Sequence, residues 1–254
     1  MKNKYYNDAI IGNKKIIASY TEKGELQRLC YPEVDGRQFI DYFQTGVKIN
    51  DSNLIYLHQD INNKYSQEYI ENTNILKTNI KNTYFNFNIE QIDFALIDQN
   101  IIVKKYIFKN NNSVDLDTKF IINSKILSND LERFGSRIVD KGIIQYNHNY
   151  AMAIFSNKNL YGHKLNDVQS TLQSAVIMDK DYIGMSNEIA ISYNIGVIHP
   201  GEQQELNIFI LVNENHDIEE KIQRCVKLNT DIEFEQSPVM SSFVLRCISE
   251  VIYL

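Results

Sequence analysis

The sequence predicts a mainly β protein: a large antiparallel β-sandwich followed by a C-terminal helical linker. From the N-terminus to about residue 212, apolar and polar residues alternate in short runs rich in Ile, Val, Tyr and Phe, which is typical of half-buried strands. Clusters of Asn, Asp, Gly and Ser separate these runs, and no long helical stripe interrupts them, which excludes alternating βαβ units. Well over a dozen strands favour two packed sheets over one open, strongly twisted sheet.

The expected strands begin with "KKIIASY" and "ELQRLCY", which flank "TEKG" and predict a β-hairpin because Gly24 can take a positive φ. Residues 128–137, "SNDLERFGSR", fit either a short helix or a long loop, and "KNNNS" is expected to be a turn. Near the end, Pro200 and Gly201 predict a turn that joins neighbouring antiparallel strands. The other runs expected as strands are "RQFIDYF", "GVKIN", "LIYLH", "SQEYI", "NILKTNI", "TYFNFNI", "IIVKKYIFK", "LDTKFIIN", "GIIQYNHN", "YAMAIFS", "SAVIMD", "EIAISYNI" and "QELNIFILV".

After residue 212 the apolar residues recur at every fourth position, at Ile218, Ile222 and Val226, which is the spacing of one helix face. Asn215 or Asp217 can cap the N-terminus of this helix. We therefore place the sandwich domain at residues 1–213 and the helical linker at 214–254.

A second helical segment is expected from Ser237-Pro238, because Pro is tolerated in the first turn of a helix. It continues into the final residues 241–254, "SSFVLRCISEVIYL", whose apolar residues have helical spacing and which no Gly, Asn or Pro terminates. An amphipathic helix needs a surface to pack against. We expect this segment to lead to a further domain that supplies that surface.

The composition narrows the classes of function. The net charge is −6 and no long Lys/Arg cluster occurs, so a nucleic-acid partner is not expected. No apolar stretch approaches the roughly 18 residues of a membrane span, and the N-terminus lacks the apolar run of a signal peptide. The chain as written is expected to be cytoplasmic, without a membrane partner.

Residues that could bind a metal or a cofactor do not form a recognisable pattern. The histidines lack HxH or HExxH spacing, and the cysteines lack CxxC spacing, so no metal ligand is assigned and reduced, inert thiols are expected. "DKD" at 179–181 fits a polar turn better than a metal pair, and no phosphate-binding loop or GxSxG motif occurs. We expect no cofactor. The residues concerned are His58, His148, His163, His199, His216, Cys30, Cys225 and Cys247.

Carboxylates are the next candidates, because a pair of Asp or Glu side chains can act as a general acid and a general base. Asp8, Asp35, Glu68 and Glu71 lie nearest to the motifs described below. Turn, cap or solvated strand positions explain them more simply, since Asx side chains satisfy backbone donors in loops. No catalytic residue is assigned. The aromatics of "YFNF" and "YIFK" are expected mainly in the core, with stacking on a sugar as the alternative.

Three stretches, in order along the first 110 residues, resemble bacterial glucoamylase-like proteins of glycoside hydrolase family 15. The opening stretch has Ile11-Gly12-Asn13, Gly24, Tyr31-Pro32 and Asp35 at the places typical of that family. The second, "YSQEYIENTNILKT", carries Tyr69, Thr73, Asn74, Leu76 and Thr78, and the third, "DFALIDQNIIVKKYIFKNN", carries Asp93 and Tyr106.

This resemblance implies an N-terminal supersandwich, a helical linker and an (α/α)6 barrel that holds two catalytic Glu residues. The present chain would then be the non-catalytic sandwich domain of a hydrolase of α-glucans or oligosaccharides, with the barrel as its partner. A second copy of the chain could also cover apolar surface and form a homodimer. Two alternatives stay open: a stand-alone carbohydrate-binding or interaction module, and a complete enzyme of sandwich fold with its site on loops.

Overall fold

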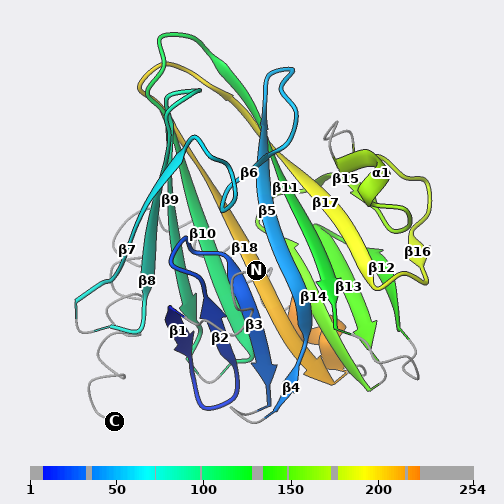
Figure 1. Cartoon of the computed structure of the whole chain (residues 1–254). Helices are drawn as coiled ribbons and strands as arrows, with labels where there is room; N and C mark the ends of the chain where they lie inside the picture. The colour runs from blue at the N-terminus through cyan, green and yellow to red at the C-terminus, as the bar shows by residue number, and fades with distance from the viewer. Residues whose placement is uncertain are drawn as a thin grey trace.

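The structure is a computed structural model that describes residues 8–32, 36–71, 73–97, 99–127, 134–147, 149–172, 177–214 and 217–223. Within these ranges the strands form two nine-stranded antiparallel sheets packed face to face, which confirms the predicted β-sandwich (Figure 1). No helix among the described residues is long and apolar enough to cross a membrane.

Sheet A has the strand order β1-β2-β3-β5-β11-β17-β15, with β4 paired to β3 and β6 paired to β5. Its strands are β1 (Ala9–Gly12), β2 (Ile17–Tyr20), β3 (Leu26–Tyr31), β4 (Arg37–Gln38), β5 (Ile40–Ile49), β6 (Ile55–Tyr56), β11 (Leu116–Ile126), β15 (Leu160–Lys164) and β17 (Glu188–Ile198).

Sheet B has the order β16-β12-β13-β14-β18-β10-β9-β8-β7. Its strands are β7 (Asn63–Tyr69), β8 (Leu76–Asn82), β9 (Phe87–Ala95), β10 (Ile101–Asn110), β12 (Phe134–Val139), β13 (Gly142–Asn147), β14 (Tyr150–Ser156), β16 (Ile183–Gly184) and β18 (Gln203–Glu214), and a short helix, α1 (Gln169–Leu172), lies between β15 and β16.

The main core lies between the sheets, because alternate residues of each strand face inward. On β10, for example, Ile102, Tyr106 and Phe108 join this core, whereas Ile101 and Val103 face the opposite way. The period-two pattern in the sequence therefore corresponds to the two faces of each sheet.

Four details of the predicted strands need correction. The pattern predicts "RQFIDYF" and "GVKIN" as separate runs, but residues 40–49 form one long strand, β5. "TYFNFNI" begins with a turn, in which Asn86 has a φ of 49°, and its strand starts only at Phe87. The described part of "SAVIMD", residues 177–179, is not a strand, and within 128–137 the described residues from Phe134 onward belong to β12.

The turn at Pro200-Gly201 is present, with Gly201 at a φ of 80°, but it does not join paired neighbours. It connects β17 of sheet A to β18 of sheet B. A turn motif specifies a reversal of the chain, whereas the hydrogen-bond partners on either side depend on the whole sandwich. The loop that contains "KNNNS" makes the same kind of crossing from β10 to β11.

The predicted helix after residue 212 is present over residues 218–223. Its buried Ile218 and Ile222 pack on the outer face of sheet B, in a cluster that includes Val103, Phe209 and Leu211. The sandwich itself therefore covers the apolar face of this first helix. The second predicted helix, with "SSFVLRCISEVIYL", lies outside the described residues, as do Cys225 and Cys247.

Candidate functional site

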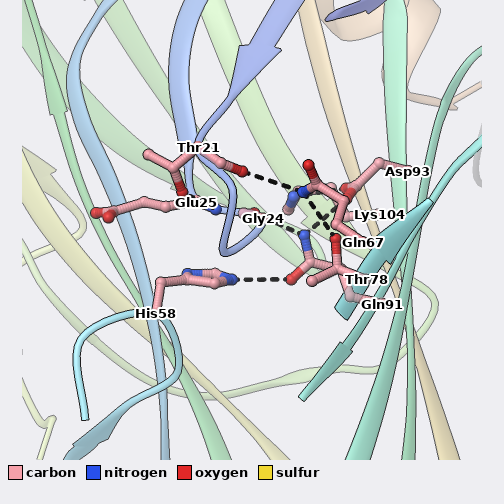
Figure 2. A network of polar contacts seen from close by, with 9 residues as sticks. All are labelled: Thr21, Gly24, Glu25, His58, Gln67, Thr78, Gln91, Asp93 and Lys104. Carbon is pink, nitrogen blue, oxygen red and sulfur yellow. Dashed lines mark hydrogen bonds and ion pairs between the residues drawn. The ribbon is translucent and has the colours of Figure 1, made fainter. Parts of the chain in front are cut away.

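The strongest concentration of polar chemistry lies inside the sandwich rather than on its surface. Gln91 and Asp93 on β9, Lys104 on β10 and His58 after β6 are all buried between the sheets (Figure 2). We call these four residues the interior cluster. Period-two alternation directs Gln91, Asp93 and Lys104 inward, because the core residues Ile89, Ile102 and Tyr106 occupy the same faces of β9 and β10.

An ion pair forms the centre of the interior cluster. Lys104 Nζ lies 2.5 Å from Asp93 Oδ1, and the two side chains are 1% and 0% exposed. The ammonium group also lies 4.7 Å from the centre of the Tyr20 ring, a favourable cation–π position. Burial raises the pKa of Asp93 and lowers that of Lys104, while the charge of each partner opposes the shift of the other.

Gln91 connects this ion pair to the N-terminal hairpin. Its Nε2 donates to Asp93 Oδ2 at 2.6 Å and to the Gly24 carbonyl at 2.8 Å. Its Oε1 lies 3.0 Å from His58 Nε2. Burial lowers the pKa of His58 to about 3, so the ring is neutral. Because the Gln91 Oε1 can only accept, Nε2 of His58 carries the proton.

Gly24 sits where the hairpin touches sheet B. It has a φ of 85°, and a Cβ at this position would lie 2.8 Å from Thr78 Oγ1. Beside it, Gln67 Nε2 donates to the Thr21 carbonyl at 3.0 Å and to Thr78 Oγ1 at 3.1 Å (Figure 2). The turn predicted from "TEKG" therefore packs closely against sheet B.

Further residues of the three family-like stretches fasten β1 to the opposite sheet. Tyr69 Oη donates to the Ile10 carbonyl and accepts from its N–H, both at 2.8 Å. Asn74 Nδ2 donates to the Gly12 carbonyl at 2.7 Å. Asn13 Nδ2 donates to the carbonyls of residues 96 and 99, both at 2.7 Å. These contacts join the short edge strand β1 and the residue after it to the end of β7 and to two loops of sheet B.

All four side chains of the interior cluster are buried from solvent. A general acid or base must reach the reacting group directly or through one water molecule, and the Asp93 and Lys104 side chains are sealed between the sheets. The chemistry that this arrangement can perform is structural: it satisfies buried polar groups and holds the N-terminal hairpin of sheet A against sheet B.

The described carboxylates considered from the sequence occupy a hairpin contact and exposed positions. Asp8 accepts a hydrogen bond from the Glu22 N–H at 2.8 Å and so stabilises the hairpin loop. Glu68 is exposed on β7 and Glu71 is exposed in the turn that follows it. Asp35 lies outside the described residues.

The described histidines are also separate. His58 belongs to the interior cluster, His163 Nε2 lies 2.9 Å from the Asp181 carbonyl, and His199 Nδ1 lies 2.9 Å from Asp115 Oδ1. Within the described ranges, no group of three or more His, Cys, Asp or Glu side chains could hold a metal ion. His148 and His216 lie outside those ranges.

Asp179 and Cys30 have local partners. Asp179 Oδ1 accepts from the N–H groups of Lys180 and Asp181, at 2.8 and 3.2 Å, which is the polar turn that "DKD" predicts. Cys30 is half-buried beside Gln38, and burial raises the pKa of its thiol. A raised thiol pKa reduces the thiolate fraction and with it the reactivity.

The aromatic residues divide between core and surface. Tyr106 and Phe108 of "YIFK" are buried and pack against Phe120. In "YFNF", Phe87 is buried, whereas Tyr84 is 73% exposed with its ring against Phe85. The core role is therefore confirmed for three of these rings.

Sequence reasoning missed the interior cluster as a unit. The signal was available in "IIVKKYIFK", where Lys104 shares its alternation with Ile102 and Tyr106. It also missed a polar cluster on the outer face of sheet A, where Tyr42 Oη and the Gln169 amide both donate to Glu188. Gln169 comes from α1, which the sequence pattern did not predict.

Comparison with known proteins finds similarity in sequence and in fold. The chain is 27% identical over 217 residues to an uncharacterized glycosyl hydrolase of Methanocaldococcus jannaschii; the match covers 81% of the chain and 34% of that relative, so it spans about a third of the relative's length. No family model matches the chain.

Solved structures of low sequence identity share the fold. A bacterial glucoamylase complexed with acarbose superposes with a TM-score of 0.75 at 13% identity, over 97% of this chain and 36% of that one. The aldose epimerase homologue of C. elegans gives a TM-score of 0.54 at 8% identity, over 81% of this chain and 98% of that one. The same sandwich is thus present both as part of a long chain and as nearly a whole one.

Proposed function

We propose that this chain is the non-catalytic N-terminal β-sandwich domain of a glucoamylase-type glycoside hydrolase that acts on α-glucans or oligosaccharides. The observation that carries the proposal is the use of the family-like residues. Asn13, Gly24 and Asn74 make hydrogen bonds between the two sheets. Thr78 and Asp93 make internal contacts within sheet B. Residues used in this way maintain a scaffold and leave the chemistry to another part of the protein.

In this proposal, residues 1–213 are the sandwich and 214–254 are the linker to an (α/α)6 catalytic barrel. The course of the chain supports it. After β18, the helix at 218–223 lies on the outer face of sheet B, and Lys221 Nζ donates to Asn213 Oδ1 at 2.8 Å. A linker anchored in this way would give the downstream barrel a fixed starting point on the sandwich.

Two measurements test the domain proposal. The open reading frame downstream of codon 254 is expected to encode repeated helical hairpins, and a stop codon there would contradict the proposal. The isolated chain is expected to release no glucose from maltooligosaccharides. If glucose release co-purifies with this chain, catalysis would belong to the sandwich itself. Release that also persists in an Asp93→Asn variant would show that the buried ion pair is not the catalytic group.

A carbohydrate-binding module is the second candidate, and exposed tyrosines favour it. Tyr161 and Tyr182 are exposed, and the Tyr182 ring lies 5.3 Å from the His163 ring. Rings of this kind can stack on a pyranose. Calorimetric titration with neutral maltohexaose separates the candidates: saturable heat that Tyr182→Ala abolishes and Tyr84→Ala does not would favour the binding module.

The homodimer stays a prediction of this proposal. Exposed apolar side chains at Met178, Tyr182, Ile183 and Met185 provide surface that a second copy could cover. Sedimentation velocity at low and high protein concentration is expected to show a concentration-dependent dimer. A single monomeric species at all concentrations would contradict it.

A further inference from the structure

The outer face of sheet B has two chemically different halves. Near Val103 and Phe209 it is apolar and covered by the helix at 218–223. Further along β10, toward Lys109, it is polar and open, and a hollow of about 470 Å³ lies over strands β7, β8, β9 and β10 and the start of β18. This second half belongs neither to the interior cluster nor to the linker contact.

Three lysines line this hollow in one row across the sheet. Lys64 on β7 pairs directly with Lys81 on β8, which pairs with Asn88 on β9, which pairs with Lys109 on β10. All three lysines are exposed. Neighbouring strands lie about 4.8 Å apart, so the row places positive charge along a line of roughly 14 Å. We call it the lysine row.

The lysine row lacks compensating negative charge. Like charges directly opposite each other in a sheet are destabilising, yet no described residue forms an ion pair with Lys64, Lys81 or Lys109. Among the residues that line the hollow the sole carboxylate is Glu90, and its Oε2 lies 2.5 Å from Lys77 Nζ. In a chain of net charge −6, this is a concentrated cationic surface.

We propose that the hollow over the lysine row binds an anionic saccharide, a sugar chain that bears phosphate or carboxylate groups; the sugar part of this inference rests on the proposed function. Lysines are point-charge partners for oxyanions. The same hollow is lined by Ser66, Asn79 and Gln203, whose hydroxyl and amide groups can exchange hydrogen bonds with sugar hydroxyls. The length of the row suits a ligand with more than one charged group.

Calorimetric titration of the whole chain at low salt tests this inference with four probes: phosphorylated maltodextrin, oligogalacturonate, neutral maltohexaose and inorganic phosphate. Phosphorylated maltodextrin or oligogalacturonate, or both, should bind saturably, and the affinity should fall as salt rises, because salt screens exposed charges. Which of the two binds more tightly identifies the anionic group.

Matched variants locate the site. Lys81→Gln and Lys109→Gln should each weaken binding by about ten-fold, since each removes a charged contact. Lys105→Gln is the control, because it removes the same charge from the same face of β10 but from a lysine already paired with Glu205 at 2.8 Å. It should change the affinity by less than about two-fold.

A second readout uses stability without ligand. Lys81→Gln relieves the repulsion with Lys64, so its unfolding midpoint at low salt should equal or exceed that of the unmodified chain. A variant that unfolds earlier would show that the row serves the fold rather than a ligand.

Three binding results would overturn the inference. They are the absence of binding heat with both anionic saccharides, an equal loss of affinity in the Lys105→Gln and Lys109→Gln variants, and an affinity for inorganic phosphate equal to that for the anionic saccharides. Absent binding at this hollow would leave the domain proposal intact, because that proposal depends on the downstream reading frame and on glucose release.

Discussion

Lys104 Nζ and Asp93 Oδ1 lie 2.5 Å apart in the middle of the sandwich, on adjacent strands of sheet B and facing sheet A. In register terms they are direct cross-strand partners. Two complementary charges at facing positions are able to satisfy each other where water is absent, provided that hydrogen bonds complete the arrangement. Gln91 supplies one of these bonds, and the Tyr20 ring covers the ammonium group.

Removal of one member of this pair should destabilise the fold strongly. Asp93→Leu leaves a buried ammonium without its partner, and breaking such a pair costs about 3–5 kcal/mol of unfolding free energy. The double variant Asp93→Leu/Lys104→Met should recover most of that loss. Urea denaturation measures both, with Lys105→Met on the solvent side of β10 as the control. A double variant no more stable than Asp93→Leu would show that the charges themselves are required.

Stability should fall in acid because of His58. Its pKa is about 3 in the folded state, below the ordinary value near 6.5, so below about pH 6.5 the unfolded chain binds a proton that the folded chain does not. From pH 7 to pH 5 this difference should remove about 2 kcal/mol of unfolding free energy.

The His58→Gln variant lacks this titrating group. Between pH 7 and pH 5 it should therefore lose about 2 kcal/mol less unfolding free energy than the unmodified chain. His199→Gln is the matched control, because His199 is exposed and Asp115 raises its pKa. Denaturant titrations at the two pH values give the comparison, and parallel losses in the His58 variant and the unmodified chain would refute the assignment.

Gly24→Ala should destabilise the hairpin contact for two reasons. A positive φ disfavours any residue with a Cβ, and the new methyl group would meet Thr78. Gly201→Ala separates the two effects, because Gly201 has a similar φ of 80° and no atom lies within 4 Å of the place that its methyl group would take.

We expect Gly201→Ala to lower the unfolding free energy by about 1 kcal/mol and Gly24→Ala to lower it by about 2–4 kcal/mol. The larger loss at Gly24 reflects the clash of the new methyl group with Thr78. Thermal unfolding of the two variants gives the difference. Equal losses of stability in the two variants would mean that the Thr78 side chain can move away from the new methyl group without destabilising the fold.

The helix at 218–223 should contribute to the stability of the sandwich. Ile218→Ala removes a buried side chain from the outer face of sheet B and should cost about 2–4 kcal/mol. Gln223→Ala, at an exposed position of the same helix, should have an effect below about 0.5 kcal/mol.

A chain that ends at residue 213 should unfold at a lower temperature than one that ends at residue 223, because the shorter chain exposes Val103 and Phe209. Equal midpoints would show that the helix is a passive tether.

The sequence predicted well those features that depend on local alternation. The β-sandwich, the hairpin at Gly24, the turn at Gly201 and the helix near Ile218 were all expected from patterns of a few residues. It predicted poorly those elements whose pattern is short or weak, such as α1 and the two-residue strand β16. Two or four residues carry too little periodicity to be recognised.

The candidate site follows the same division. Lys104 and His58 stand in runs that the sequence indicated as strands, whereas Gln91 and Asp93 lie beyond the expected run "TYFNFNI". Their convergence was not visible, because His58 and Gln91 are 33 positions apart. The lysine row was equally hidden, since Lys64, Lys81 and Lys109 come from three different strands. The spacing of residues along the sequence does not reveal how two strands pair. The pairing register decides which side chains become neighbours.

What the sequence alone determined is the secondary-structure class and, along each strand, which residues share a face, because side chains alternate with a strict period of two. What only the tertiary structure decided is which strands became neighbours. Pro200-Gly201 reverses the chain but passes from sheet A to sheet B, and so β17 and β18 pair with distant strands rather than with each other. The reason is physical: a turn is fixed by a few local dihedral angles, whereas the partner of a strand is selected by burial and hydrogen bonding over the entire sandwich.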